Sequence, residues 1–176
     1  MIHVLTKLIR PSSIGGFLFM STMETLVHPF HAPFVESTTS VFSTMLKWKI
    51  EPITSLRLPN FQPQHDVSGI IGFSNALRGT IVISLDREVA LSAAEAFIGQ
   101  RPETIDSDVL DMVGELANMI AGNAKQRIGT AGISLGLPTV VSGSDIRVSF
   151  EPGARVEFLS FATPKGPLCV QWAIRE

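Results

Sequence analysis

The chain has little cysteine and little charge. Cys169 is the only cysteine in 176 residues, which excludes an internal disulfide and any metal site built from several cysteines. It lies in a strand-like run, so we expect a small buried hydrophobe rather than a nucleophile. Charged residues make up 17% of the chain, and 14 Lys and Arg against 16 Asp and Glu give a net charge of -2. No run is rich in Lys and Arg, so a nucleic-acid binder that works through phosphate contacts is not expected.

The patterns of common catalytic and metal sites are also missing. The four histidines show no zinc-type spacing, and the pair His28 and His31 is split by Pro29 ahead of the expected core. We therefore expect no metal site. There is no phosphate-binding glycine loop, no G-x-S-x-G and no Cys–His pairing at a recognisable spacing. An enzyme that acts on small molecules has little support.

The first 22 residues differ from the rest. Lys7 and Arg10 precede a short apolar run that resembles a signal peptide weakly, because two glycines interrupt it and no small-x-small cleavage site follows. The run is too short to span a bilayer. We interpret residues 1–22 as an N-terminal extension, either disordered or the result of a start codon placed too early, with Met20 or Met23 beginning the working protein. No membrane attachment is expected, and cytoplasmic localisation is predicted.

Residues 23–176 suit a single domain, and hydrophobic residues at 45% of the chain can form a sizeable core. Periodicity predicts helices over residues 33–47, 87–98 and 107–128. Asp86 is the expected N-cap of the second helix, Asp106 or Ser107 that of the third, and Gly99 and Gly129 end these two helices. Strands are predicted over residues 50–58, 66–74, 78–85, 133–137, 139–141, 146–150, 155–161 and 168–174. Runs linked by hairpins imply an α+β fold with a mainly antiparallel sheet and helices packed on it.

The long helix has two different faces. At about 100° per residue, one side carries an ordinary core stripe. Its members are Val109, Val113, Leu116, Ile120 and Ala124. The opposite side carries Asp111, Glu115, Asn118 and Gly122 within about 60° of one another. The helix therefore presents a carboxylate and a carboxamide one turn apart, beside a glycine.

A solvated surface explains this polar side only in part. Glutamate is a good helix former, so solvation alone accounts for Glu115. Asparagine is a weaker helix former, and glycine inside a helix costs about 1 kcal/mol relative to alanine. We interpret Gly122 as clearance for another molecule that approaches closely. Gly114, at the boundary of the two faces, is expected to admit a neighbouring helix.

The string D-x-x-x-E-x-x-N-x-x-x-G, followed by Asn-Ala-Lys, resembles the signature of the CheC/CheX/FliY family of chemotaxis phosphatases. The runs DVSGIIGFS, RGTIVISL, EVAL, GELANMIAGNAK and LPTVV resemble CheX-like members in particular, in the right order from about residue 29 to the C-terminus. CheC-like members carry two E-x-x-N sites. Here the first helix has Glu36 followed by Thr39, so one site is expected. FliY-like members usually carry further domains, and none is expected here.

The resemblance implies a phosphatase that acts on the aspartyl phosphate of a CheY-like response regulator. The residue types suit this reaction, because an acyl phosphate loses its carboxylate without a proton and hydrolysis depends on placing a water in line. We assign Asn118 to position the water and Glu115 to contact a basic group, which the resemblance implies is a lysine of the partner. Asp111 is expected to be a partner contact or a solvated residue, and Gly122 to admit the partner's backbone. No cofactor of the chain's own is expected, and Mg²⁺ would belong to the response regulator.

Two further expectations concern partners. The alternative to the enzyme is a non-catalytic binding module that docks on a response regulator or a flagellar motor component; an intact Glu115 and Asn118 favour the enzyme. The resemblance also implies a homodimer joined through its sheet. Strand-like runs reach almost to the C-terminus, and an exposed sheet edge is a hazard unless it is paired.

Overall fold

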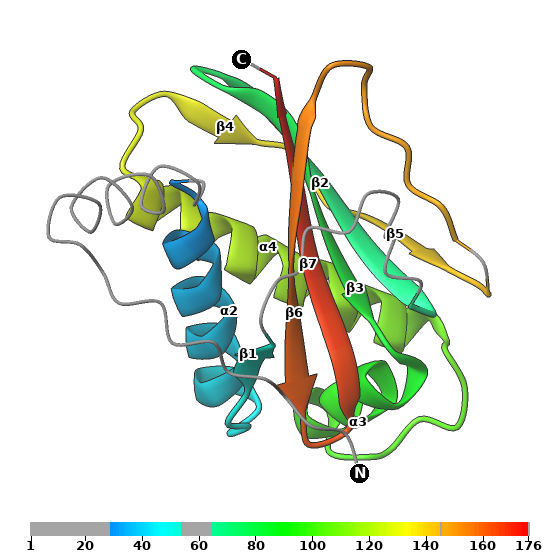
Figure 1. The fold of residues 1–176 in the computed structure, drawn as a ribbon. Coiled ribbons are helices and arrows are strands. Elements are labelled where there is room, and N and C mark those ends of the chain that lie inside the picture. The colour runs from blue at the N-terminus through cyan, green and yellow to red at the C-terminus, as the bar shows by residue number, and fades with distance from the viewer. Residues whose placement is uncertain (1–28, 54–64, 145, 176) are drawn as a thin grey trace, which may run out of the picture.

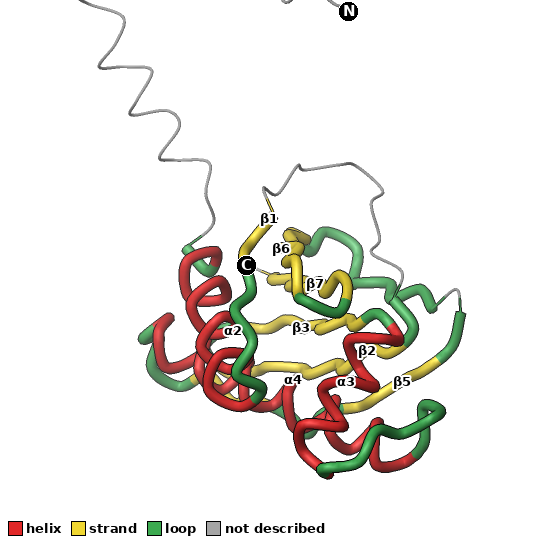
Figure 2. The backbone as a smooth tube through the Cα atoms, turned by 90° about the horizontal axis from the view of Figure 1, so that it is seen from below, coloured by secondary structure: helices red, strands yellow, loops and turns green. Residues whose placement is uncertain are grey.

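The computed structural model describes residues 29–53, 65–144 and 146–175. In this part of the chain, seven strands form one antiparallel sheet and three helices pack against it (Figures 1 and 2). The predicted α+β class, with a mainly antiparallel sheet and a long helix, is confirmed. The predicted N-terminal extension, residues 1–22, lies outside the described residues.

The elements follow one another as helix, three strands, two helices and four strands. They are α2 (His31–Met45), β1 (Glu51–Ile53), β2 (Val67–Asn75), β3 (Arg78–Leu85), α3 (Arg87–Ile98), α4 (Ser107–Ile128), β4 (Ile133–Leu135), β5 (Thr139–Ser142), β6 (Arg155–Thr163) and β7 (Gly166–Arg175). Strands lie in the order β1-β6-β7-β3-β2-β4, and β5 also pairs with β2. β2 and β3 form a hairpin, as do β6 and β7, whereas the other four pairings join strands that do not follow one another in the chain.

The central strands are covered on both faces. Residues 81–85 of β3 are all buried, as their alternation of apolar and small residues predicts. On the face toward the helices, Ile81 stands between Ile71 of β2 and Trp172 of β7. The Trp172 ring in turn stacks on Phe34 of α2, with ring centroids 4.8 Å apart and planes inclined by 18°. This stack joins the first helix of the described chain to its last strand.

The ends of α4 follow from its caps. The Asp106 carboxylate accepts a hydrogen bond from the Val109 N–H at 3.1 Å, and Gly129 ends the helix with a φ of +69°. Lys125 and Arg127 lie in the last turn, where their positive charges interact favourably with the helix dipole. The predicted limits of this helix are confirmed, as are Asp86 and Gly99 at the ends of α3. None of the helices in the described ranges combines the length and apolar character that crossing a bilayer requires.

The buried side of α4 meets β2 at a point of close approach. A Cβ placed on Gly69 would lie 2.7 Å from the Ala117 Cβ and 3.4 Å from the Val113 carbonyl oxygen. Side chains larger than hydrogen and methyl at these two positions would push the helix away from the sheet. The predicted core stripe of α4 is confirmed, since all five of its members are buried.

The strand predictions are accurate except at two places. Residues 146–150 form no strand, although exposed and half-buried residues alternate along them as in a strand. A strand needs a partner as well as an apolar side, and the outer edge of β2 is already paired with β4 and β5. The predicted strand over residues 50–58 is limited to β1 among the described residues, and residues 54–64 lie outside them.

Gly69 and Gly72 provide a matched test of how closely α4 approaches the sheet. Gly69→Ala should lower the free energy of unfolding by about 1–3 kcal/mol, because the new methyl overlaps Ala117 in a packed interior. Gly72→Ala, on the same strand, meets nothing within 4 Å and should leave stability nearly unchanged. Urea denaturation measures both. Equal midpoints for the two variants would contradict the close approach.

Candidate functional site

The polar stripe of α4 faces away from the core, as predicted. Asp111, Glu115 and Asn118 are exposed and Gly122 is partly exposed, while the opposite side of the helix is buried. Among the described residues, no hydrogen bond or ion pair involves the side chain of Glu115, Asn118 or Asp111. These three polar groups are therefore available to a partner.

The exposed side of α4 is negatively charged along the first half of the helix. Asp108, Asp111 and Glu115 are exposed, and both basic residues of α4 lie in its last turn. Several other surface carboxylates of the described chain are paired with arginines, as Glu88 is with Arg101 at 2.7 Å. An unpaired Glu115 beside a neutral Asn118 is suited to bind a basic group without giving up an internal partner.

Gly122 leaves space beside the stripe. A Cβ placed on it would meet nothing within 4 Å, so no packing constraint in the described chain requires glycine there. This geometry agrees with the clearance that the sequence predicts.

Gly114 has a different role from the one expected. Its missing side chain admits β5 and the residue before it, not a neighbouring helix: a Cβ there would lie 3.3 Å from Val140 Cγ2 and 3.7 Å from Pro138 Cγ. The prediction of a neighbouring helix is wrong because α4 lies at the β2–β5 side of the sheet, where a strand is the next element (Figures 1 and 2). The contact places Pro138, in the β4–β5 connection, against α4 at Gly114, next to the edge of the stripe.

In α2, the glutamate that would begin a second E-x-x-N motif forms an ion pair with α4 instead. The Glu36 carboxylate of α2 pairs with the Arg127 guanidinium of α4 at 3.3 Å, and Thr39 follows in place of an asparagine. This solvent-exposed ion pair joins the two helices at the surface.

Other candidate chemistry is weak in the described chain. Cys169 is fully buried, and burial raises the pKa of its thiol to about 12, so no appreciable thiolate forms near neutral pH. The expectation of a buried small side chain is confirmed. No group of three or more His, Cys, Asp or Glu that could hold a metal occurs among the described residues. His28 of the predicted weak pair lies outside them.

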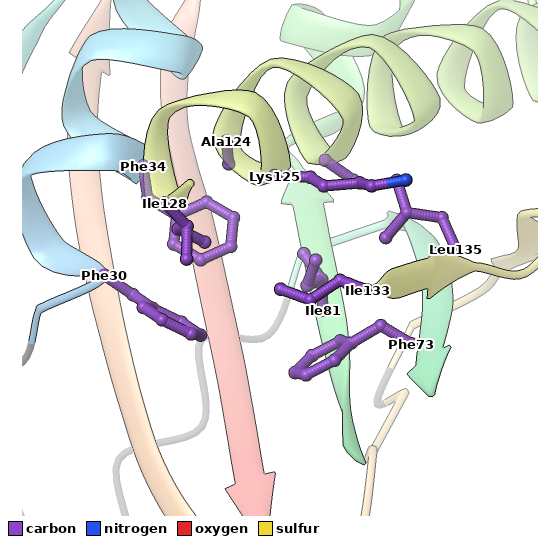
Figure 3. Close-up of a pocket in the computed structure, with 10 residues that line it drawn as sticks. Phe30, Phe34, Phe73, Ile81, Ala124, Lys125, Ile128, Ile133 and Leu135 are labelled. Atoms are coloured by element: carbon purple, nitrogen blue, oxygen red, sulfur yellow. The ribbon is translucent and has the colours of Figure 1, made fainter. Parts of the chain in front are cut away.

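Two cavities of the described chain lie away from the stripe. One lies between the start of α2, the end of α4 and β4, has apolar walls apart from Lys125, and leaves room of only about 10 Å³, about one water (Figure 3). A larger cleft of about 340 Å³ lies between the β2–β3 turn, β7 and residues 150–154. Glu115 and Asn118 line neither. They stand on a convex helix surface, so a reaction there needs a second molecule that brings its own pocket.

Comparison with known proteins identifies relatives over most of the described chain. The profile of the family described as chemotaxis phosphatase CheX matches residues 67–162. The CheY-P phosphatase CheX of Thermotoga maritima is 30% identical over 104 residues, which cover 56% of this chain and 67% of that protein.

Two solved structures extend the similarity to the whole fold. The chemotaxis protein CheX from Vibrio vulnificus superposes with a TM-score of 0.78 at 28% identity, over 84% of this chain and all of that one. The CheX chain of a CheX–CheY–BeF3–Mg²⁺ complex from Borrelia burgdorferi superposes with a TM-score of 0.65 at 26% identity, over 84% of this chain and 98% of that one.

Gly122→Ala should stabilise the protein. Alanine is about 1 kcal/mol more favourable than glycine inside a helix, and the added methyl has nothing to collide with. The free energy of unfolding should therefore rise by up to about 1 kcal/mol, measured by urea denaturation. A loss of stability would show that Gly122 is required by the fold and not by a partner.

Proposed function

The chain belongs to the CheX family of chemotaxis phosphatases, and on this premise we propose that it hydrolyses the aspartyl phosphate of a CheY-like response regulator. The observation that carries the proposal is the pair Glu115 and Asn118, exposed and without internal partners on the convex side of α4. The named activity of the Thermotoga maritima relative and the CheX–CheY complex from Borrelia burgdorferi support the same partner class. The partner class supports a cytoplasmic location.

The chemistry needs little from this chain beyond position. An aspartyl phosphate is an acyl phosphate, and its carboxylate leaves without a proton, so no general acid is required. The rate depends on a water held in line with the phosphorus. A helix that enters the partner's phosphorylated site can supply one well-placed polar group and exclude bulk water.

Asn118 is the residue proposed to position that water. Its carboxamide can accept a hydrogen bond from water and donate one, and it stays neutral beside the phosphoryl oxygens. Because Asn118 has no partner among the described residues, its carboxamide is available for this role.

Glu115 is the residue proposed to bind the partner. A carboxylate one turn from Asn118 would be repelled by a phosphoryl group unless it met a cation, so a basic side chain of the response regulator is its expected contact. Asp111, one turn earlier, extends the same negative surface, and Gly122, one turn later, lets the partner's backbone approach. The Mg²⁺ of the reaction is assigned to the partner.

We also infer self-association through the sheet. The outer strands of the described sheet are β1 on one side and β4 and β5 on the other. Such edges present unpaired backbone groups that a second copy can cover. Light scattering at micromolar concentration, returning twice the chain mass, is the expected result.

Asn118→Ala should abolish hydrolysis while the complex still forms. Loss of the water-positioning group should slow phosphate release from the phosphorylated response regulator by roughly 100-fold or more, to the rate of the regulator alone, and change affinity less than about threefold. Asn123→Ala is the control, since it truncates another carboxamide of α4 that lies off the stripe. Equal rates for wild type and Asn118→Ala, with binding retained, would support the non-catalytic docking module instead.

Glu115→Gln should weaken the complex. The substitution keeps the shape of the side chain and removes the charge, so the affinity should fall by about tenfold, or about 1.4 kcal/mol, and depend less on salt. Glu103→Gln removes an exposed carboxylate from the α3–α4 connection and serves as the control for net charge. Titration calorimetry measures both variants. An unchanged affinity for Glu115→Gln would overturn the assigned contact.

A further inference from the structure

Leu137 is exposed far beyond the other large hydrophobic side chains of the described chain. It is 92% exposed, whereas the next, Ile53, is 49% exposed. A single exposed leucine is ordinary when it lies on a loose loop or far from any site. Leu137 lies neither on a loose loop nor far from the candidate site, as its neighbours in the β4–β5 connection show.

The residues on both sides of Leu137 are held in place. The Gly136 N–H donates a hydrogen bond to the Gly72 carbonyl oxygen at 2.8 Å, and Pro138 lies against Gly114 of α4. Leu135 and Thr139 then pair with β2. The ring of Pro138 also fixes the backbone angle φ of that residue, which directly follows Leu137. The backbone on both sides of Leu137 is therefore fixed, and the leucine side chain is held in solvent.

Leu137 also lies level with the catalytic candidate. Pro138 contacts α4 at Gly114, while Leu135 shares the small apolar cavity with Ala121 and Lys125, so the connection runs antiparallel to the helix (Figures 1 and 3). Gly114 and Ala121 are seven residues apart, about 10 Å along the axis. Leu137 lies between these two contacts, which bracket a stretch of α4 that includes Asn118.

Leu137 flanks the Asn118 side of the stripe. At 100° per residue, Asn118 lies about 40° from Gly114, whereas Glu115 lies about 100° from it. Because Gly114 faces the β4–β5 connection, Asn118 is the stripe residue turned toward the leucine. The exposed leucine and the exposed Asn118 thus belong to neighbouring elements on the same side of α4.

We propose that Leu137 is the apolar anchor of the response-regulator interface and packs against a hydrophobic surface bordering the partner's phosphorylated aspartate. The inference rests on the proposed function and deepens it. The stripe is polar, and the single charge contact proposed for Glu115 accounts for only about tenfold in affinity. Interfaces derive most of their affinity from a few apolar or aromatic anchors surrounded by polar contacts. Leu137 supplies the buried apolar contact, and Glu115 and Asn118 supply charge and chemistry.

The test compares Leu137→Ala with Leu137→Met and Ile98→Ala. The probes are a CheY-like response regulator carrying BeF3⁻ and Mg²⁺, for affinity, and the phosphorylated regulator, for kinetics. Leu137→Ala should weaken binding and raise KM by about tenfold and leave kcat within twofold, because the leucine does not reach the reacting atoms. Leu137→Met should retain most of the affinity. Ile98→Ala truncates another exposed aliphatic side chain, at the end of α3, and should change nothing.

The outcomes separate this inference from the proposed function. Unchanged affinity and KM for Leu137→Ala, in a protein that is active, would overturn the anchor and leave the phosphatase intact. A wild type that binds the regulator without hydrolysing its phosphate, and that Leu137→Ala weakens, would retain the anchor and refute the enzyme. Light scattering of Leu137→Ala gives a third result: a change of mass would place the leucine in a contact between copies and overturn the proposal.

Discussion

The close approach of α4 to β2 is the contact on which the site depends. Gly69 and Ala117 bring helix and strand so near that a methyl on the strand would overlap the helix side chain. With the helix this low on the sheet, β5 can contact it from the side, where Gly114 accommodates Val140 and Pro138. The rotation of α4 about its axis is set by these small residues. Asp111, Glu115 and Asn118 consequently face solvent.

In the proposed reaction, this chain and its partner contribute different parts of the site. The stripe stands on a convex helix and lines neither of the two cavities described above, and in the proposed reaction the concave site, the metal and the phosphoryl group all belong to the partner. A long helix with well-formed caps is stiff enough to carry two side chains into such a site without rearranging. This explains how, in the proposed reaction, a chain with one buried cysteine and no metal cluster among its described residues takes part in phosphate chemistry.

Much of the fold could be predicted because its signals are local. Capping residues, glycines at helix ends and the periods of apolar side chains located α3, α4 and the two long hairpins to within a few residues. The errors arose where an element depends on a neighbour. Residues 146–150 have the alternation of a strand without forming one, since pairing is decided by which sheet edge is open. Gly114 indicated a close contact, but one sequence could not tell a helix from a strand as its partner.

The sequence by itself determined α4 and the composition of its two faces, because the positions of residues around a helix follow from their spacing alone. Spacing also brought Glu115, Asn118 and Gly122 together, since all three lie within one stretch of eight residues. Only the tertiary structure decided what lies beside them. It carried the β4–β5 connection, with Leu137 nineteen residues after Asn118 in the numbering, alongside α4 and left the leucine exposed. The reason is that β4 and β5 must pair along β2 and pass α4 at Gly114, a constraint of sheet register and helix packing that no local pattern expresses.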